Sequence, residues 1–176
     1  LAAVTDPNMN VTTYVIDDFG QMLSQESPVT GTTTYGYGLG GELLTTTDAN
    51  GAMTTRVYDA LGRSVSATSS RAVTPTETVQ WQYDDTTAGR FGLGRLTQMI
   101  DPTGVTTYFY ERRGILRREE GAFTGLTDSY FTTFGHDANG TRSSIGYPSG
   151  TNVAYTADFA GRQIAASASG PGAPRP

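Results

Sequence analysis

A short phrase that recurs at nearly constant spacing constrains this chain more than any other feature. The phrase is Tyr-Asp, two variable residues, Gly and often Arg, and its fullest copy is YDALGR at residues 58–63. Most steps between its glycines are 20 or 21 residues, and two longer steps are typical of loops inserted into a repeat array. The glycines that mark the repeat are Gly20, Gly41, Gly62, Gly94, Gly114, Gly140 and Gly161.

Each copy of the phrase has the chemistry of a chain reversal. Asp at the first position can accept hydrogen bonds from the amides that follow, and Gly at the fourth position takes the left-handed conformation of a bulged hairpin turn. The sequence therefore predicts turn units near residues 17–20, 38–41, 59–62, 84–94, 111–114, 137–140 and 158–161. Besides the glycines, the turn motif comprises Asp17, Tyr58, Asp59, Arg63, Tyr83, Asp84, Arg95, Asp137 and Asp158.

A second set of turn signals falls about midway between the first. Asp-Pro and Asn-Gly pairs favour turns, because Pro fixes φ and Asn-Gly tolerates positive φ. Strand-like stretches rich in Thr, Tyr and β-branched residues lie between the turns, as in VTTYVI at 11–16, MTTRVY at 53–58, TVQWQY at 78–83 and VTTYFY at 105–110. Consecutive strands joined by such short turns run antiparallel. We therefore expect an all-β chain with negligible helix, in which even residues 111–121 form a turn and a strand.

The composition favours a sheet with two half-polar faces. Leu, Ile, Val and Phe together make up about 18% of the 176 residues, whereas Thr is the most common residue and ten Tyr are present. The two faces of 11–16 and of 105–110 are equally mixed, so we expect tyrosines to pack in ladders across strands and no dense aliphatic core to form. The array is predicted to cover residues 1–165, with 166–176 as a flexible tail or linker.

The missing residue types exclude several classes of site. The chain has no Cys, which rules out disulfides and thiolate metal sites. All twelve basic residues are Arg, which rules out a Schiff-base lysine and a P-loop lysine. The formal net charge of −5, without a basic run, argues against nucleic acid as a partner. No basic leader or long apolar run is found, so we expect a soluble chain without membrane insertion.

The repeated phrases resemble the YD repeats, also called RHS repeats. The resemblance rests on YDALGR, YDDTTAGRFGLGRLTQMIDPTGVTTYFY and DANGTRSSIGYPSG, and it covers roughly residues 4–165. It implies a curved β-sheet strip that forms part of a hollow shell. Such shells enclose a toxic domain in bacterial toxin complexes and polymorphic toxins, and a similar shell supports cell adhesion in animal teneurins. The copies here are degenerate, with Gly in place of Asp in 36–41, Glu at 111 and His136 in place of Tyr.

Motifs that could carry chemistry are better explained by the repeat. GYGLGG at 36–41 matches a nucleotide-binding pattern, but a strand and a turn follow it where a helix would be required. A lone histidine, His136, can build neither a catalytic triad nor a His-rich metal site by itself. Asp17-Asp18 and Asp84-Asp85 lack the ligand spacing of a calcium loop, although weakly bound calcium on a turn stays open. We therefore expect no catalytic residue, no cofactor and no enzyme activity.

The sequence leaves three functions open. The first is a non-catalytic wall segment that encloses, carries or displays another domain, with neighbouring repeats and a cargo or cell-surface partner as its contacts, in a secreted or surface-exposed bacterial protein. The second is a carbohydrate- or protein-binding adhesion module, in which Trp81, Tyr83, Tyr108 and Tyr110 would stack on a ligand. The third is self-association into a tube or filament through unpaired strand edges.

Overall fold

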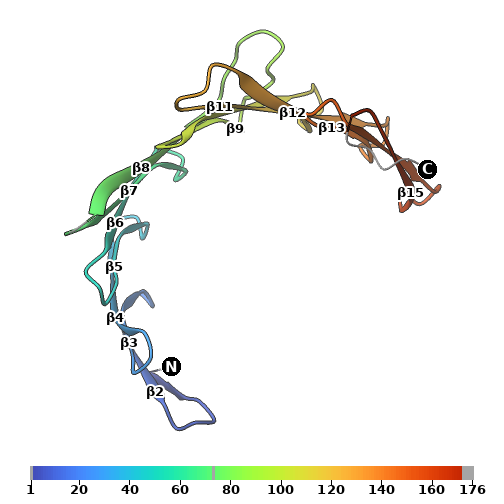
Figure 1. The fold of residues 1–176 in the computed structure, drawn as a ribbon. Coiled ribbons are helices and arrows are strands. Elements are labelled where there is room, and N and C mark those ends of the chain that lie inside the picture. Colours follow the sequence, from blue (N-terminus) through green and yellow to red (C-terminus); the bar gives the residue numbers. More distant parts are fainter. Residues whose placement is uncertain (1, 73, 172–176) are drawn as a thin grey trace. The chain divides into compact units, whose positions relative to one another are not determined.

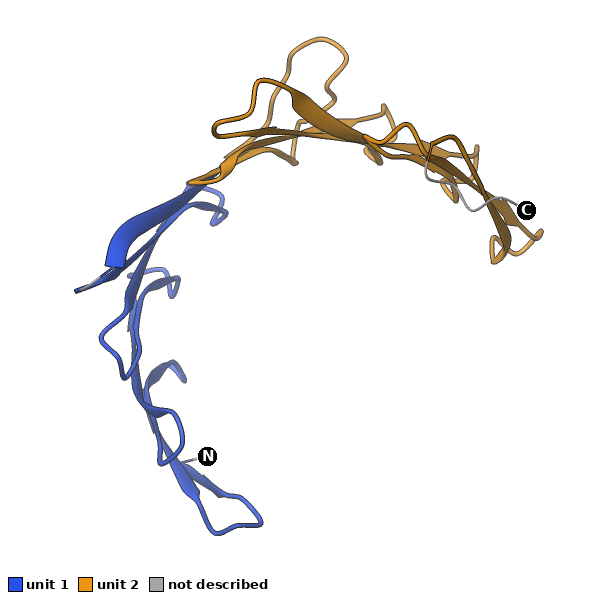
Figure 2. Ribbon diagram, in the orientation of Figure 1, with its two compact units in different colours: residues 1–80 blue, residues 81–176 orange. Residues whose placement is uncertain are grey.

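The computed structural model describes residues 2–72 and 74–171, and every regular element in them is a β-strand. Hydrogen-bonded neighbours follow the chain order from β1 to β15, and every pairing for which a register is defined is antiparallel. The chain divides into two units, residues 1–80 and 81–176 (Figure 2). The predicted all-β antiparallel fold is confirmed, and no helix able to cross a membrane occurs in the described part of the chain.

Unit 1 is a run of hairpins in which each strand pairs with the one before it and the one after it. Its strands are short, from three to ten residues, because turns follow one another closely along the chain. They are β1 (Ala3–Thr5), β2 (Val11–Ile16), β3 (Met22–Ser27), β4 (Gly31–Tyr37), β5 (Leu43–Thr47), β6 (Met53–Tyr58), β7 (Ser64–Arg71) and the first part of β8 (Thr74–Tyr83).

Unit 2 continues the same plan from Trp81. Its strands are the last part of β8, then β9 (Leu96–Asp101), β10 (Gly104–Tyr110), β11 (Leu116–Phe123), β12 (Ser129–His136), β13 (Arg142–Gly146), β14 (Asn152–Ala157) and β15 (Gln163–Ser169). β15 continues four residues beyond the boundary predicted at 165, because Ala166 to Ser169 pair with β14. The predicted tail is therefore wrong at its start, and residues 172–176 lie outside the described part of the chain.

Each unit is one layer thick, without a second sheet packed against either face (Figure 1). Ile145 is the one apolar side chain that the described residues bury, at 8% exposed, so the prediction that no dense aliphatic core forms is confirmed. Thr97, 3% exposed, is buried as well. Stability must therefore come from backbone ladders, turns and contacts between neighbouring strands, since burial of apolar surface is small.

A β-bulge follows six of the recurring turns. In the β2–β3 pair, Val15 lies opposite Ser24 and Ile16 lies opposite Met22, which leaves Leu23 without a partner. The same shift recurs in β4–β5, β6–β7, β10–β11, β12–β13 and β14–β15. Bulges increase local twist and bend the bulged strand, so the bulges at these six turns bend the sheet locally within each unit.

Candidate functional site

The recurring turn is the one constellation of residues that the chain repeats. In the copy at 59–63, the Asp59 amide donates to the Arg63 carbonyl at 2.9 Å and the Gly62 amide donates to the Asp59 carbonyl at 3.0 Å. Gly62 has φ of 75°, which is the left-handed region that favours glycine. We call this pair of backbone bonds the turn frame. It is also formed by the turns that open at Asp17, Gly38, Glu111, Asp137 and Asp158, and by the second-set turns at Asp6, Asp48 and Tyr147.

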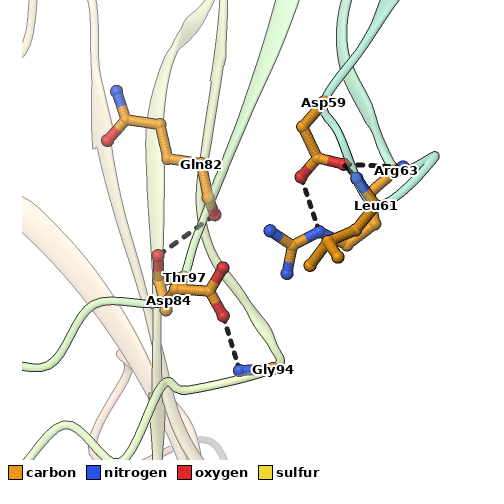
Figure 3. Close-up of polar contacts among 7 residues, drawn as sticks. All are labelled: Asp59, Leu61, Arg63, Gln82, Asp84, Gly94 and Thr97. Atoms are coloured by element: carbon orange, nitrogen blue, oxygen red, sulfur yellow. Dashed lines mark hydrogen bonds and ion pairs between the residues drawn. The ribbon is translucent and has the colours of Figure 1, made fainter.

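The aspartate at the start of the frame satisfies amides that the ladder cannot reach. Oδ1 of Asp59 accepts from the Leu61 amide at 2.9 Å and from the Arg63 amide at 3.0 Å (Figure 3). Its Oδ2 accepts from Arg63 Nε at 2.7 Å. These bonds, the Arg63 amide first, hold the pKa of the Asp59 carboxyl below its ordinary value. Asp158 has the same partners in its own turn, and the pKa of its carboxyl is lowered in the same way.

One turn forms the frame without an aspartate. Gly38 stands at the opening position, and its missing side chain is replaced in space by Glu42. A Cβ atom at Gly38 would lie 2.6 Å from Glu42 Oε1, and one at Gly40 would lie 2.7 Å from Oε2. The Glu42 carboxylate therefore lies beside the opening position of this turn, in the space next to Gly38 and Gly40.

At three frames, those that open at residues 38, 59 and 111, the preceding residue is a tyrosine that bonds to the repeat before it. The Tyr37 hydroxyl donates to the Met22 carbonyl at 3.0 Å, and the Tyr58 hydroxyl donates to the Leu43 carbonyl at 2.9 Å. In unit 2 the Tyr110 hydroxyl donates to the Leu96 carbonyl at 2.6 Å. We call this bond the tyrosine link.

The tyrosine link forms just beyond the end of the backbone hydrogen-bond ladder between two neighbouring strands. The pairing of β3 with β4 ends at Ser24, two residues after Met22, and that of β5 with β6 ends at Thr45, two residues after Leu43. The carbonyls of Met22 and Leu43 thus lie beyond the ladder and receive the hydroxyl instead. Ring-to-ring ladders were predicted for the tyrosines, but at these three positions the structure shows a hydroxyl bond to the backbone.

In unit 2 the residue after one frame lies against the glycine of the next frame. Arg95 lies against Gly114, where its guanidinium fills the space that a Cβ would need, and its Nε donates to the Gly114 carbonyl at 3.2 Å. A Cβ at Gly140 would lie 3.1 Å from Ile115, and one at Gly161 would lie 3.4 Å from Thr141. Successive turns of unit 2 are therefore in contact as well as the strands.

The loop at 84–94 keeps the outer part of the frame around an insertion. The Asp84 amide donates to the Arg95 carbonyl at 3.1 Å, and Asp84 Oδ1 accepts from the Gly94 amide at 2.6 Å (Figure 3). Just beyond it, the buried Thr97 hydroxyl donates to the Gln82 carbonyl at 3.0 Å. The insertion thus leaves the strand pairing around it intact.

Unit 2 also carries a row of arginines stacked on aromatic rings. The guanidinium of Arg118 lies 5.3 Å from the centroid of the Phe109 ring and 4.4 Å from that of Phe131. Arg90 lies 4.6 Å from the centroid of the same Phe109 ring. Arg118 also pairs with Glu120 at 2.8 Å. We call this set the arginine–aromatic stack. Its cation–π contacts cover apolar ring surface and stabilise this part of the strip, which has no buried core.

The four predicted ligand-stacking residues lie on two strands of unit 2. Trp81 and Tyr83 are on β8, Tyr108 and Tyr110 are on β10, and all four are half-buried. The Tyr110 ring has the Arg95 guanidinium 5.7 Å from its centroid, and its hydroxyl is used by the tyrosine link. Burial raises the pKa of the Tyr108 and Tyr110 hydroxyls. At Tyr110 the structure therefore favours packing over an open stacking platform.

The other motifs singled out in the sequence lie in ordinary repeat positions. GYGLGG ends β4 and forms a turn frame, and His136 ends β12 opposite Arg142. Asp85 accepts from the Thr87 amide and pairs with Arg90 at 3.3 Å, while Asp17 closes its own turn. Within residues 2–72 and 74–171, no three His, Asp or Glu side chains converge as a metal site would require.

Sequence reasoning missed the tyrosine link and the role of Glu42. The signal for the link was present, because each linked carbonyl lies 14 or 15 residues before its tyrosine, at the second position after the preceding turn glycine. Glu42 could have been found from the coincidence of Gly at the opening position with an acidic residue four positions later.

Solved structures with the same fold include a chain of a Tc holotoxin. The chain is similar to a chain of the TcdB2–TccC3 complex, with a TM-score of 0.76, 17% identity, and coverage of 98% of this chain and 11% of that one. It is similar to a chain of the Photorhabdus luminescens Tc holotoxin pore, with a TM-score of 0.80, 19% identity, and coverage of 93% and 9%. The TcdB2–TccC3–Cdc42 structure gives a TM-score of 0.75 at 18% identity, over 96% and 11%. The chain thus spans about a tenth of the length of these neighbours, while no family model and no curated protein matches it.

Proposed function

We propose that this chain is a wall segment of a YD-repeat shell that encloses, carries or displays another domain and catalyses no reaction of its own. The observation that carries the proposal is the one-layer repeat sheet, whose fold is that of Tc toxin components over more than nine-tenths of the chain. The YD-type phrases support it independently, because they are the features that resemble shell-forming repeats.

The contacts between repeats suit a wall. A wall must stay closed under thermal motion although it is one layer thick, so each repeat needs several bonds to its neighbour. Here the backbone ladder, the tyrosine link and the turn-to-turn contacts at Gly114, Gly140 and Gly161 all join successive repeats. Repeats that contact only their neighbours fold cooperatively when such interfaces are strong.

The two half-polar faces suit the same role. A wall that holds a cargo has water or cargo on both sides, so neither face can be uniformly apolar without causing aggregation. Threonine hydroxyls, tyrosine rings and stacked arginines give each face apolar area together with hydrogen-bonding groups. The partners under this proposal are neighbouring repeats and an enclosed or displayed domain, in a secreted or surface-exposed bacterial protein.

The experiment is to open the wall and ask whether the enclosed domain becomes accessible. Deleting one whole repeat, residues 38–58, from the chain in its natural flanking sequence removes one strand pair while preserving the register of the rest. We expect a protease to cleave the flanking domain far faster in the deletion variant than in the parent, because a shell shortened by one repeat cannot close. Equal cleavage of that domain in both proteins would overturn the proposal.

A further inference from the structure

We propose that one edge of unit 1 docks a basic amphipathic helix. The surface consists of Phe19, Leu39 and Leu61, at the tips of the turns that join β2 to β3, β4 to β5 and β6 to β7, and we call it the tip row. Because the strands are antiparallel and follow chain order, these three turns lie on the same edge of the unit. This inference is independent of whether the chain encloses a cargo.

The tip row is apolar although the turns do not require it. Phe19 is 89% exposed, Leu39 is 112% exposed and Leu61 is 76% exposed. The turn frame uses the opening residue, the glycine and backbone groups, so its two middle positions are free. In unit 2 the same positions hold Arg112 and Arg113 in one turn, Ala138 and Asn139 in the next, and Phe159 and Ala160 in the last, where Phe159 is 114% exposed. Unit 1 differs in that three successive turns on one edge each carry a large exposed apolar side chain. Large exposed apolar groups at free positions mark a contact surface.

A groove runs between the first two tips. It has a volume of about 540 Å³ and lies between the 17–20 and 38–41 turns. Phe19, Leu23, Tyr37 and Leu39 supply its apolar lining, and Asp17 and Gln21 supply polar groups. Glycines at 38, 40 and 41 form the wall of the groove on the side of the second turn, where the Glu42 carboxylate lies beside Gly38 and Gly40. An apolar side chain of a partner can therefore enter on the side of Phe19, Leu23 and Leu39.

Charge indicates which kind of partner fits. Residues 1–80 hold eight of the 17 acidic residues and three of the 12 arginines, so unit 1 carries the whole net charge of −5. Asp17, Asp18, Glu42 and Asp59 all lie in or beside the turns of the tip row. Arg63 is on this edge too, but its guanidinium is bound to the Asp59 carboxylate at 2.7 Å. Two acidic edges repel each other, so a second copy in this position is disfavoured and a basic partner is favoured.

The spacing of the tips indicates a helix. Successive turns on one edge are two strands apart, which is about 9.5 Å. Residues i and i+7 of an α-helix lie on one face about 10.5 Å apart, so three such residues can meet the three tips. In an extended strand the same-face residues are about 7 Å apart, and this interval does not match. Lysine or arginine beside the apolar stripe would then face the carboxylates between the tips.

The test uses a defined probe and the intact chain. An 18-residue helical peptide of leucine and lysine, with leucines at heptad spacing, is titrated into the protein and followed by calorimetry and by NMR shift mapping. We expect micromolar binding, with shifts concentrated at residues 17–20, 38–42 and 59–62. Binding should weaken at least tenfold in the Phe19→Ser/Leu39→Ser/Leu61→Ser variant and also when salt is raised from about 50 to 500 mM.

Two controls make the result decisive. The matched variant Val29→Ser removes an exposed apolar tip on the opposite edge, where Val29 is 77% exposed, and it should leave binding unchanged. A leucine and glutamate peptide of the same pattern should not bind. Absence of binding, equal binding to the triple variant, or shifts spread over both edges would overturn the proposal. Self-association that the triple variant abolishes would also overturn it, since the occupant would then be a second copy.

Discussion

Unit 1 and unit 2 use the same turn frame and the same tyrosine link, but they fill the space between turns differently. In unit 2, Arg95 covers Gly114, Ile115 approaches Gly140 and Thr141 approaches Gly161. In unit 1, Gln21 approaches Gly41 at 3.3 Å, but no heavy atom lies within 4 Å of the place where a Cβ at Gly62 would stand. The turns of unit 2 are therefore joined to one another at every step, whereas unit 1 has a gap.

The gap has an identifiable cause. Glu42 is the residue that would cover Gly62, because it follows its frame as Arg95 follows the 84–94 loop. Its carboxylate is instead folded over Gly38 and Gly40, in the turn that lacks an aspartate. The frame is thus the constant part of the repeat. The side chain of the residue after it contacts either its own turn or the glycine of the next turn.

The largest expected difference between the units concerns the turn glycines. Gly114→Val should lower the free energy of unfolding by about 3 kcal/mol, because a β-branched residue is strained at φ of 82° and its side chain would displace Arg95. Gly62→Val should lower it by about 1–2 kcal/mol, since φ of 75° is equally strained but the space is open. Urea unfolding followed by circular dichroism measures both.

Equal losses at the two glycines would show that contacts between turns contribute nothing. Gly20→Val is the matched control, because Gly20 has φ of 82° and open space around it. It should behave like Gly62→Val. A loss at Gly20 as large as that at Gly114 would contradict the interpretation.

The second prediction concerns the arginine–aromatic stack. Arg118→Leu should destabilise the chain by about 1–2 kcal/mol, because it removes contacts with the Phe109 and Phe131 rings and the ion pair with Glu120. Arg56→Leu in unit 1 is the matched change, since the Arg56 guanidinium donates to the Thr46 hydroxyl at 3.1 Å. We expect it to lose no more than about 0.5 kcal/mol. If unfolding curves show that Arg56→Leu lowers the free energy of unfolding as much as Arg118→Leu does, the units do not differ in this respect.

Much of the fold could be predicted from the sequence because its signals are local. The strands predicted at 11–16 and 53–58 are found with the same bounds, and those at 78–83 and 105–110 are found with longer starts. Aspartate and glycine determine a turn within five residues, so no knowledge of distant contacts is needed. The end of the array was misjudged because β15 contains Ala and Ser, which carry little strand signal, and its pairing with β14 decides its structure.

The contacts between repeats could not be predicted in the same way. The tyrosine link depends on where a ladder ends, and that depends on the bulge after the preceding turn. The stack of Arg118 on Phe109 and Phe131 depends on the register of three strands. Neither the end of a ladder nor the register between strands can be predicted from one strand alone. Once both are known for one repeat, the constant repeat length indicates the equivalent positions in the others.

The third prediction tests whether the tyrosine link is common to both units. Tyr58→Phe and Tyr110→Phe should each lower the free energy of unfolding by about 1 kcal/mol, because each removes one hydroxyl bond to a carbonyl beyond the ladder. Tyr35→Phe is the matched control, at a strand position that does not precede a turn, and we expect less than about 0.5 kcal/mol. A loss confined to Tyr110→Phe would mean that the link stabilises unit 2 alone. In that case the two units would differ in the tyrosine link as well as in the contacts between successive turns.

The smallest effect tests the cause of the gap in unit 1. Gly38→Asp places a carboxylate within reach of the Glu42 carboxylate, and Glu42→Arg removes the carboxylate that lies beside the opening position, so each alone should destabilise by about 0.5–1 kcal/mol. The two changes together recreate the pairing of Asp59 with Arg63, so the double variant should return to within about 0.5 kcal/mol of the parent.

The single variant Glu42→Arg should close the gap, because Gly38 has no carboxylate that would hold the arginine in its own turn, whereas the added Gly38→Asp change supplies one. An arginine in place of Glu42 can extend to Gly62 as Arg95 extends to Gly114. Gly62→Val should then be more harmful in the Glu42→Arg variant than in the parent, by about 1 kcal/mol, because a side chain at that position would meet the new guanidinium. If the effect of Gly62→Val is unchanged, the contact in unit 2 depends on features specific to the loop at 84–94. The residue after the frame would then not be free to serve either turn, and the difference between the units would lie in the insertion itself.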